Sequence, residues 1–514
     1  MTEERIVNRS ERTLNRGIMP WHVSFIALGG IIGSCYFLEL GDTYASLGPG
    51  AVLVTYAIAG LTIFGVMQSF AELLVNIPRR GSFVSYTREF MGDTASAGIG
   101  WAFWANWVCY IPSEALATAI FVNSLIRDIS GKEMGVGYTF LWGVLALTLL
   151  TFINVFHVKC FGYVESIMAI IKIISIALFV ICGVCIWLGL AASDVREWGG
   201  NEGFIGTSIM LAGEGSVLEK LFPEGGFVMI TIMIWTLVNF QGSEIVGLSA
   251  AETQNPEKNV PLACKRVAFR IILIYLVPIF VLSLIMPYFE GNIEKSVFAD
   301  TLYHYGFGWG SQVFTIVTMI AAFSCANSGF YGTVRSLYGL SVEGLAPKFL
   351  SNLNRFNTPQ NATLFTIVPI WIVFVLGFGV EQLGWGGGDM PLYTALVGIS
   401  GFTGTLCWVG ILYSQIKFRK RLIQRGYDPN EVLTVKAVWY PWLEYFAVIL
   451  QVAAMIMLVF EDGGLNIFIL SMIIIIVPIA IYVTQKKRGK IRTSISIGAD
   501  EVTFDEKFPD RSHK

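Results

Sequence analysis

The feature that most constrains this chain is a series of about twelve apolar stretches, each close to the roughly 20 residues that a helix needs to cross a bilayer. They lie near residues 22–45, 50–76, 96–126, 138–157, 162–191, 227–250, 267–288, 309–342, 362–380, 391–415, 437–460 and 464–485. Charged residues make up only 14% of the chain, whereas a soluble protein carries about 25%. The sequence therefore predicts an all-α polytopic membrane protein whose twelve transmembrane helices lie in a lipid bilayer.

The distribution of Lys and Arg predicts the orientation in the membrane. If residues 1–20 are cytoplasmic, one side receives most of the basic loop residues, including Arg79, Arg80 and the runs 417–425 and 486–492. The other side receives only Arg127, Lys132, Arg196, Lys220 and Lys295. This asymmetry follows the positive-inside rule, so we expect both termini in the cytoplasm and an even number of spans.

Sequence motifs for catalysis or cofactor binding are absent. The chain has four His, no His, Cys and carboxylate cluster with metal-ligand spacing, and no phosphate-binding glycine loop. Cys182 and Cys185 are spaced like a redox or zinc pair, but inside an apolar span we interpret them as small apolar residues. We therefore expect no cofactor, no metal, no nucleic-acid partner and no enzymatic activity.

Two glycine-containing interruptions lie in the middle of predicted spans. The first span contains "GGIIGS" (29–34), and the sixth contains "NFQGSEIVG" (239–247). Glycine can simply permit close helix packing, but five spans separate these motifs, as in transporters whose inverted repeats each begin with a broken helix at the substrate site. Unwound N–H and C=O groups need partners inside a membrane. The half-helix ends could bind a carboxylate and an ammonium, which predicts a zwitterionic substrate.

Four segments carry a more specific resemblance: "GGIIGS", "FQGSEIVGLSAAETQNPEKNVPLA" (240–263), "ANSGFYGTVRSLYGLSVEGLAPK" (326–348) and "FRKRLIQRGYDPNEVLTVKAVWYPW" (418–442). From about residue 15 to 490 the chain resembles the amino acid permeases of the amino acid–polyamine–organocation superfamily, near the bacterial lysine and aromatic amino acid permeases and the yeast general permeases. The resemblance implies a leucine-transporter-type fold, with two inverted repeats of five helices, discontinuous helices 1 and 6, and two further helices.

This fold implies a division of the chain into successive parts. They are a cytoplasmic N-terminal segment (1–20), a first repeat with spans 1–5 (21–191), an extracellular loop (192–226), a second repeat with spans 6–10 (227–415), a cytoplasmic loop (416–436), spans 11 and 12 (437–485) and a cytoplasmic tail (486–514). The tail is polar and lacks apolar periodicity, so we expect it to be mobile.

The resemblance also implies where a substrate would bind. The N–H groups and hydroxyl around Ser34 and Cys35 would meet the substrate carboxylate, and the Ile31 carbonyl would meet its ammonium. Carbonyls near Val238 and Gln241 would complete the ammonium site, and Phe240 or a neighbouring residue would cap the substrate as a gate. Tyr110 and Ser113 are candidate pocket residues, although hydrogen bonding between helices is the default for polar groups on packed spans. The helix breaks would centre on Gly29, Gly30, Gly33 and Gly242.

The first span departs from the family pattern. A "GSC" triplet stands where the family has "GTG" or "GSG", so Cys35 adds bulk at the closest approach to the substrate. Glu39 and Asp42 stand where relatives carry small or neutral residues.

Two charged residues deep in spans are candidates for coupling. Lys172 lies about three turns into the fifth span, too deep to reach water easily. In related proton-coupled permeases, a lysine in a matching "IKI" context occupies the place that sodium takes in sodium-coupled relatives. Lys172 could therefore release a proton, or it could be a permanently charged strut for the first span. Glu114, which follows Pro112 in the third span, could line the pocket, relay a proton or bind a cationic side chain, and a structural or proton-linked role is favoured.

The prediction is a secondary active amino acid importer of the plasma membrane that works by alternating access and is driven by protons. Glu39, Asp42 and Glu114 favour a cationic amino acid such as lysine as its substrate. An amino acid exchanger and a sodium-coupled carrier are alternatives of the same class. A transporter-like amino acid sensor is an alternative of a different class, but the tail contains no recognisable signalling domain.

Overall fold

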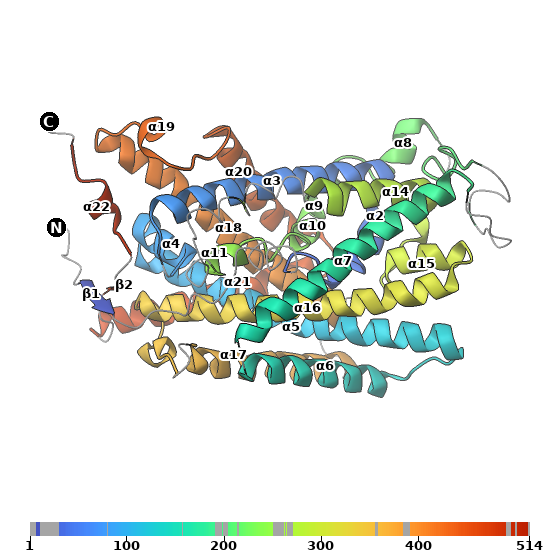
Figure 1. Cartoon of the computed structure of the whole chain (residues 1–514), viewed down its shortest axis with the longest axis horizontal. Coiled ribbons are helices and arrows are strands. Elements are labelled where there is room, and N and C mark those ends of the chain that lie inside the picture. The colour runs from blue at the N-terminus through green and yellow to red at the C-terminus, as the bar shows by residue number, and fades with distance from the viewer. Residues whose placement is uncertain are drawn as a thin grey trace.

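The computed structural model describes residues 7–10, 30–79, 81–156, 158–190, 198, 204–212, 215–249, 262, 264, 271–354, 358–383, 391–489, 495–498 and 501–511. These residues form an elongated bundle in which most long helices run along the long axis (Figure 1). Both chain termini lie at one end of the bundle, which we call the terminal end. The short helices α8 (Val217–Leu221) and α15 (Val297–His304) lie toward the opposite end.

Nine helices in the described part of the chain are long and apolar enough to cross a membrane. They are α3 (Pro49–Asn76), α5 (Asp93–Ser130), α6 (Val136–Phe156), α7 (Val158–Trp187), α16 (Gly308–Val342), α17 (Gln360–Gln382), α18 (Leu392–Gln424), α20 (Trp442–Met457) and α21 (Gly464–Lys487). The prediction of an all-helical membrane protein is confirmed, whereas the count of twelve spans stays a prediction. The three remaining predicted spans are near 22–45, 227–250 and 267–288. In the last of these, a π-helical turn (Ile271–Leu276) leads into α14 (Val277–Ile285).

The first predicted span is interrupted within its described portion. Residues 30–33 form a turn and an extended stretch, Ser34–Tyr36 form a single 3₁₀ turn, and α2 (Glu39–Leu47) begins only after it. Gly33 is extended, with φ −112° and ψ −166°, and glycine is a poor helix former because its backbone is so free. Gly29 lies outside the described residues.

The sixth predicted span is interrupted at a matching place. It consists of α9 (Val228–Thr231), α10 (Met233–Val238), a series of turns over 239–244, and α11 (Ile245–Ser249). Gly242 has φ +96°, a conformation that favours glycine. A Cβ atom on Gly242 would lie 2.2 Å from the Gly30 carbonyl oxygen, so the two breaks meet backbone to backbone. The predicted discontinuities in helices 1 and 6 are confirmed.

Helix α5 is the centre of the bundle. It packs against α16, α18, α6, α21, α17 and α4 (Phe83–Met91). Trp107 of α5 and Trp408 of α18 are among the largest fully buried side chains. A helix surrounded by other helices can carry polar side chains inside a membrane because they face protein and not lipid. This environment allows Glu114 of α5 to be buried beside the first break.

The termini depart from a purely helical structure. Strand β1 (Val7–Ser10) pairs in parallel with β2 (Ile495–Gly498), in a register that places Val7 opposite Ile495. Both strands lie at the terminal end (Figure 1). A shared end for both termini agrees with an even number of crossings, and the side of the membrane that this end faces stays a prediction.

The described part of the tail is ordered, so the expectation of a mobile tail is wrong for residues 501–511. Helix α22 (Phe504–Lys507) begins with a capping box between Thr503 and Glu506. The Phe504 ring is fully buried, and its neighbour Asp505 accepts hydrogen bonds at 2.8 Å from Arg421 of α18 and at 2.5 Å from Arg425, directly after α18. Phe504 and Phe508 are four residues apart, a spacing that places both rings on one face of a helix. This aromatic pair was the feature of the sequence that indicated an anchored tail.

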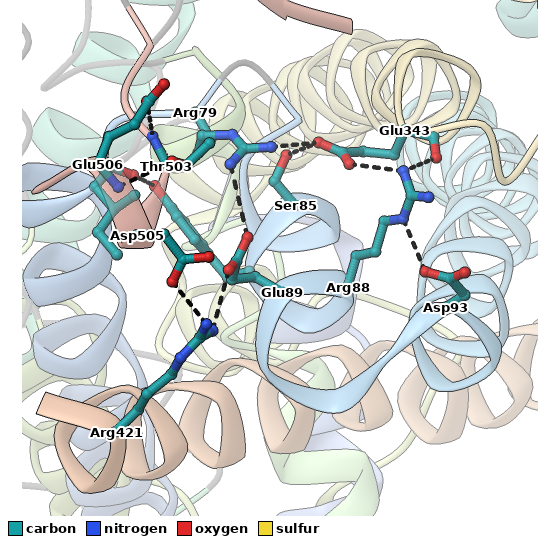
Figure 2. A network of polar contacts seen from close by, with 12 residues as sticks. Arg79, Ser85, Arg88, Glu89, Asp93, Glu343, Arg421, Thr503, Asp505 and Glu506 are labelled. Atoms are coloured by element: carbon teal, nitrogen blue, oxygen red, sulfur yellow. Dashed lines mark hydrogen bonds and ion pairs between the residues drawn. The ribbon is translucent and has the colours of Figure 1, made fainter. Parts of the chain in front are cut away.

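A buried ion-pair network joins the elements of the terminal end (Figure 2). Glu343, directly after α16, lies 3.3 Å from Arg79 and 3.2 Å from Arg88, and Arg88 reaches Asp93 of α5 at 2.9 Å. Arg79 also lies 3.9 Å from Glu89 of α4. Burial raises the pKa of the Glu343 carboxyl, but Arg79 and Arg88 outweigh that effect, so the pKa ends below its usual value.

We expect Glu343→Gln to destabilise the protein, because removing one partner of a buried ion pair costs about 3–5 kcal/mol. A lowered pKa in the folded state means that this stabilisation is fully present above the usual carboxyl pKa of about 4.3. It is lost as the pH falls through the lowered pKa. Thermal unfolding in detergent should therefore show a large deficit at pH 7 that shrinks in acid. Glu431→Gln, an exposed acid of α19 (Pro429–Val432), is the control. Equal melting temperatures for wild type and Glu343→Gln would contradict this account.

Candidate functional site

The free N–H group of the first break is bound by a carboxylate of the chain. The backbone nitrogen of Ser34 donates to both carboxylate oxygens of Glu114, at 3.1 Å each. Glu114 lies on α5, two residues after Pro112, and is 1% exposed. The Ser34 hydroxyl lies 3.1 Å from the hydroxyl of Tyr393 on α18. A break in helix 1 thus presents an anion-binding N–H group, as expected for a half-helix end.

Sulfur and phenol groups surround the same backbone. The Tyr110 hydroxyl donates to Cys35 Sγ at 3.3 Å, and Cys325 Sγ of α16 donates to the Gly30 carbonyl at 3.2 Å. A Cβ atom on Gly33 would lie 2.4 Å from a Glu114 oxygen and 2.8 Å from Cys325 Sγ. Glycine at position 33 is therefore what allows Glu114 to approach the break.

The carbonyl groups of both breaks converge on two further side chains. The Tyr275 hydroxyl lies 2.5 Å from the Asn239 carbonyl oxygen and 3.4 Å from that of Ile31. Lys172 of α7 donates to the Ile32 carbonyl at 3.0 Å. The cationic end of an amino acid would find acceptors of the same kind in this region. Sequence reasoning missed Tyr275, because a lone tyrosine in an apolar span has no distinctive signal.

Lys172 lies in a fully buried charge cluster. Its ammonium interacts electrostatically with Glu165 and Glu114. Glu165 also accepts hydrogen bonds from Ser324 and, at 3.4 Å, from Asn327 of α16. Glu165 therefore faces the interior of the bundle.

The second break is braced by an acid of its own. Gly242 donates its N–H to one carboxylate oxygen of Glu244 at 3.2 Å, and Trp408 donates to the other at 3.0 Å. Phe240 packs its ring 4.6 Å from the Tyr275 ring and 6.1 Å from the Tyr56 ring. Aromatic side chains therefore cover the carbonyl side of the two breaks.

Three predicted site residues form hydrogen bonds within their own segment or to a neighbouring helix. Gln241 forms a pair of hydrogen bonds with Ser400 of α18, at 3.0 Å and 2.9 Å. The Val238 carbonyl accepts from the Gln241 backbone at 3.0 Å, and the Ser113 hydroxyl donates to the Tyr110 carbonyl at 2.8 Å. These three residues serve the helices themselves in this structure. The structure brings together Gly30, Ile31, Gly33, Ser34, Cys35, Tyr110, Glu114, Lys172, Phe240 and Gly242.

Unpartnered polar atoms surround the breaks. Within the described ranges, buried side-chain atoms without a hydrogen-bond partner include Glu39 Oε2, Tyr56 Oη, Asn106 Nδ2, Thr236 Oγ1 and Asn239 Oδ1. Buried polar groups in proteins are nearly always hydrogen-bonded. The breaks therefore retain capacity for a polar ligand. No group of three or more His, Cys, Asp and Glu side chains in the described residues could hold a metal ion.

Comparisons with known proteins agree with this arrangement. The family model described as "Amino acid permease" matches residues 22–494. The lysine-specific permease LysP of Escherichia coli (strain K12) is 30% identical over 445 residues, covering 85% of each chain. The gamma-aminobutyric acid permease of Bacillus subtilis (strain 168) is 30% identical over 497 residues, covering 97% of this chain and 98% of its own. These relatives are permeases, in agreement with the prediction of a transporter and not an enzyme.

Two further comparisons concern a yeast relative and a solved structure. The basic amino-acid permease of Saccharomyces cerevisiae (strain ATCC 204508 / S288c) is 30% identical over 451 residues, covering 85% of this chain and 74% of its own. The crystal structure of MhsT in complex with L-phenylalanine matches with a TM-score of 0.56 and 13% sequence identity. It covers 88% of this chain and 98% of the MhsT chain. This likeness concerns the fold alone and confirms the predicted fold class.

Proposed function

Because the chain belongs to the amino acid permease family, we propose that it is a secondary active transporter that imports amino acids by alternating access. The substrate binds where the breaks of helices 1 and 6 meet. The plasma membrane is its location, and the terminal end faces the cytoplasm. The basic side chains at that end, such as Arg79, Arg88 and Arg421, support this orientation through the positive-inside rule.

The observation that carries the proposal is the bond from the Ser34 nitrogen to the Glu114 carboxylate. In the proposed mechanism, Glu114 occupies the place that the α-carboxylate of a substrate takes. The α-ammonium then faces the carbonyl groups of Ile31 and Asn239, which the Tyr275 hydroxyl now contacts. Backbone groups recognise the part that all amino acids share, and the surrounding side chains select among them.

Displacement of Glu114 offers a route to proton coupling. Once the substrate takes the Ser34 N–H group, Glu114 is a buried carboxylate that has lost a hydrogen-bond donor. Loss of a hydrogen-bond donor makes the charged form of a buried carboxylate more costly, so Glu114 takes up a proton as the substrate binds. Lys172 supplies a positive charge at the Ile32 carbonyl, where a sodium ion would be redundant. The proton therefore travels with the substrate.

The substrate class that we favour is cationic amino acids such as lysine. Among relatives about equally similar to this chain, two are named a lysine-specific permease and a basic amino-acid permease, and one a gamma-aminobutyric acid permease. All three names describe molecules that carry an amino group and a carboxylate. The buried acid Glu39, close to the first break, supports the cationic choice.

Uptake of labelled L-lysine into proteoliposomes tests the function. We expect accumulation when an inward proton gradient is imposed in sodium-free buffer, and only equilibration without the gradient. Uptake that requires sodium would contradict proton coupling in favour of a sodium-coupled carrier. Uptake that requires amino acid preloaded inside the vesicles would identify an exchanger. Absence of uptake for all twenty amino acids would contradict the proposed function itself.

Glu114→Gln tests the displacement step. We expect this variant to exchange lysine across the vesicle membrane at zero gradient but to fail to accumulate it when the proton gradient is applied, because glutamine cannot carry the coupled proton. Glu133→Gln, which removes an exposed acid just beyond the end of α5, should accumulate lysine normally. Gradient-driven accumulation by Glu114→Gln would remove Glu114 from the coupling mechanism.

A further inference from the structure

We propose that Glu39 is the side-chain subsite of this transporter, where it accepts hydrogen bonds from the terminal ammonium or guanidinium group of a cationic amino acid. The inference rests on the proposed function and deepens it by assigning one residue to the choice of substrate. Of the five unpartnered atoms around the breaks that were named above, Glu39 Oε2 is the only one that belongs to an acidic side chain.

Glu39 is buried without a compensating charge. The residue is 3% exposed, and its Oε2 atom has no hydrogen-bond partner among the residues that the structure describes. The charged group that faces it is Asp42, another acid, and no described lysine or arginine interacts with it. Acids inside membrane spans are expensive and are retained for function, and they usually have a partner. A ligand cation would supply the partner that the described chain does not.

The surroundings of Glu39 place it in the candidate site. It is the first residue of α2, four residues after Cys35, and α2 packs against α10 of the second broken span. Electrostatic interactions link Glu39 with Cys35, Tyr56 and Tyr393. The Tyr393 hydroxyl lies 3.6 Å from Cys35 Sγ, and the same hydroxyl contacts the Ser34 hydroxyl. The Tyr56 hydroxyl is itself unpartnered within the described ranges and provides a second acceptor on the same side.

The spacing along helix 1 suits a long side chain. Glu39 follows Ser34 by five residues, which corresponds to about 8–10 Å at the rise of α and 3₁₀ helices. A substrate whose carboxylate lies at the Ser34 nitrogen needs an extended stem to bring its cation to Glu39. Lysine has a flexible four-carbon stem that ends in an ammonium. Amino acids with the same terminal ammonium on a shorter side chain would leave both this ammonium and Glu39 without a partner.

A binding comparison in proteoliposomes tests the proposal with L-lysine and with L-norleucine, which lacks the terminal ammonium. We expect wild type to bind lysine at least about 30-fold more tightly than norleucine, the lower end of the effect of a buried charge pair. Glu39→Gln should remove this preference and still bind norleucine. Glu290→Gln, which removes an exposed acid from the 3₁₀ turn that packs against α2, should keep it. In wild type, affinity should fall from lysine through ornithine to 2,3-diaminopropionate.

Three outcomes would overturn the proposal: equal affinity of wild type for lysine and norleucine, an unchanged lysine preference in Glu39→Gln, and loss of the preference in Glu290→Gln. If Glu39→Gln binds neither ligand, Glu39→Asp decides, since it keeps the charge. A lysine preference in Glu39→Asp supports the subsite, and its absence overturns it. Failure of the proposed function is distinct from all of these, because wild type would then transport no amino acid at all.

Discussion

Gly242→Ala should abolish amino acid uptake, with a loss of more than about 100-fold, the cost expected when reacting or binding groups are misplaced by about 1 Å. The added Cβ would lie 2.2 Å from the Gly30 carbonyl oxygen and 2.6 Å from its carbon. Backbone atoms cannot move aside as a flexible side chain can. The φ of +96° at this position is also unfavourable for alanine. The variant must separate the two breaks, and the carbonyl groups of Ile31 and Asn239 would no longer converge.

The measurement is initial uptake of labelled lysine by proteoliposomes that contain equal amounts of folded protein, checked by thermal unfolding. Gly379→Ala in α17 is a matched control, because a Cβ there would meet nothing within 4 Å. We expect wild-type uptake from the control. Wild-type uptake by Gly242→Ala would show that the contact between the two breaks is not needed for transport.

Lys172→Met should have the second-largest effect, namely the loss of gradient-driven uptake. The substitution removes the donor at 3.0 Å from the Ile32 carbonyl and leaves Glu165 buried without its cation. Breaking a buried charge pair from one side costs about 3–5 kcal/mol. Lys132→Met, which changes an exposed lysine beyond the end of α5, is the control and should transport normally.

Two readouts separate the possible roles of Lys172. If the ammonium only braces helix 1, then Lys172→Met should lose lysine binding and exchange together with accumulation. If the ammonium also takes part in coupling, then exchange at zero gradient should persist while accumulation disappears. Normal proton-driven accumulation by the variant would exclude Lys172 from both roles.

The breaks were predictable because they follow from local composition and from symmetry. Gly30 and Gly33 weaken helix 1 within a few residues of each other, and Gly242 does the same five spans later. Inverted repeats then place the two weak points at the same depth. Glu244 was also predictable as a brace, since it is only two residues from the N–H group that it binds.

The partners of the breaks were less predictable because they come from distant helices. Glu114 is 80 residues from Ser34, and its contact depends on how α5 packs beside the break. Sequence reasoning therefore left its role open among several possibilities. Tyr275 and the Gln241–Ser400 pair depend in the same way on helix rotation. Periodicity cannot resolve rotation in spans that are apolar on nearly every face.

For the tail, the sequence led to a prediction that was wrong. Its composition is that of a polar, solvated segment, which led to the expectation of mobility. Two aromatic residues one helical turn apart are enough to anchor it, with Asp505 held by Arg421 and Arg425. Short anchored segments of this kind carry too few apolar residues to register as a periodic pattern.

A structure with bound L-lysine, determined by electron cryo-microscopy in lipid nanodiscs, tests the central claim most directly. We predict that the ligand carboxylate will lie within hydrogen-bond distance of the Ser34 nitrogen and that Glu114 will have moved off that nitrogen. The ligand ammonium at Cα will face the Ile31 and Asn239 carbonyls. A ligand bound elsewhere, with both Glu114 oxygens still at the Ser34 nitrogen, would contradict the account.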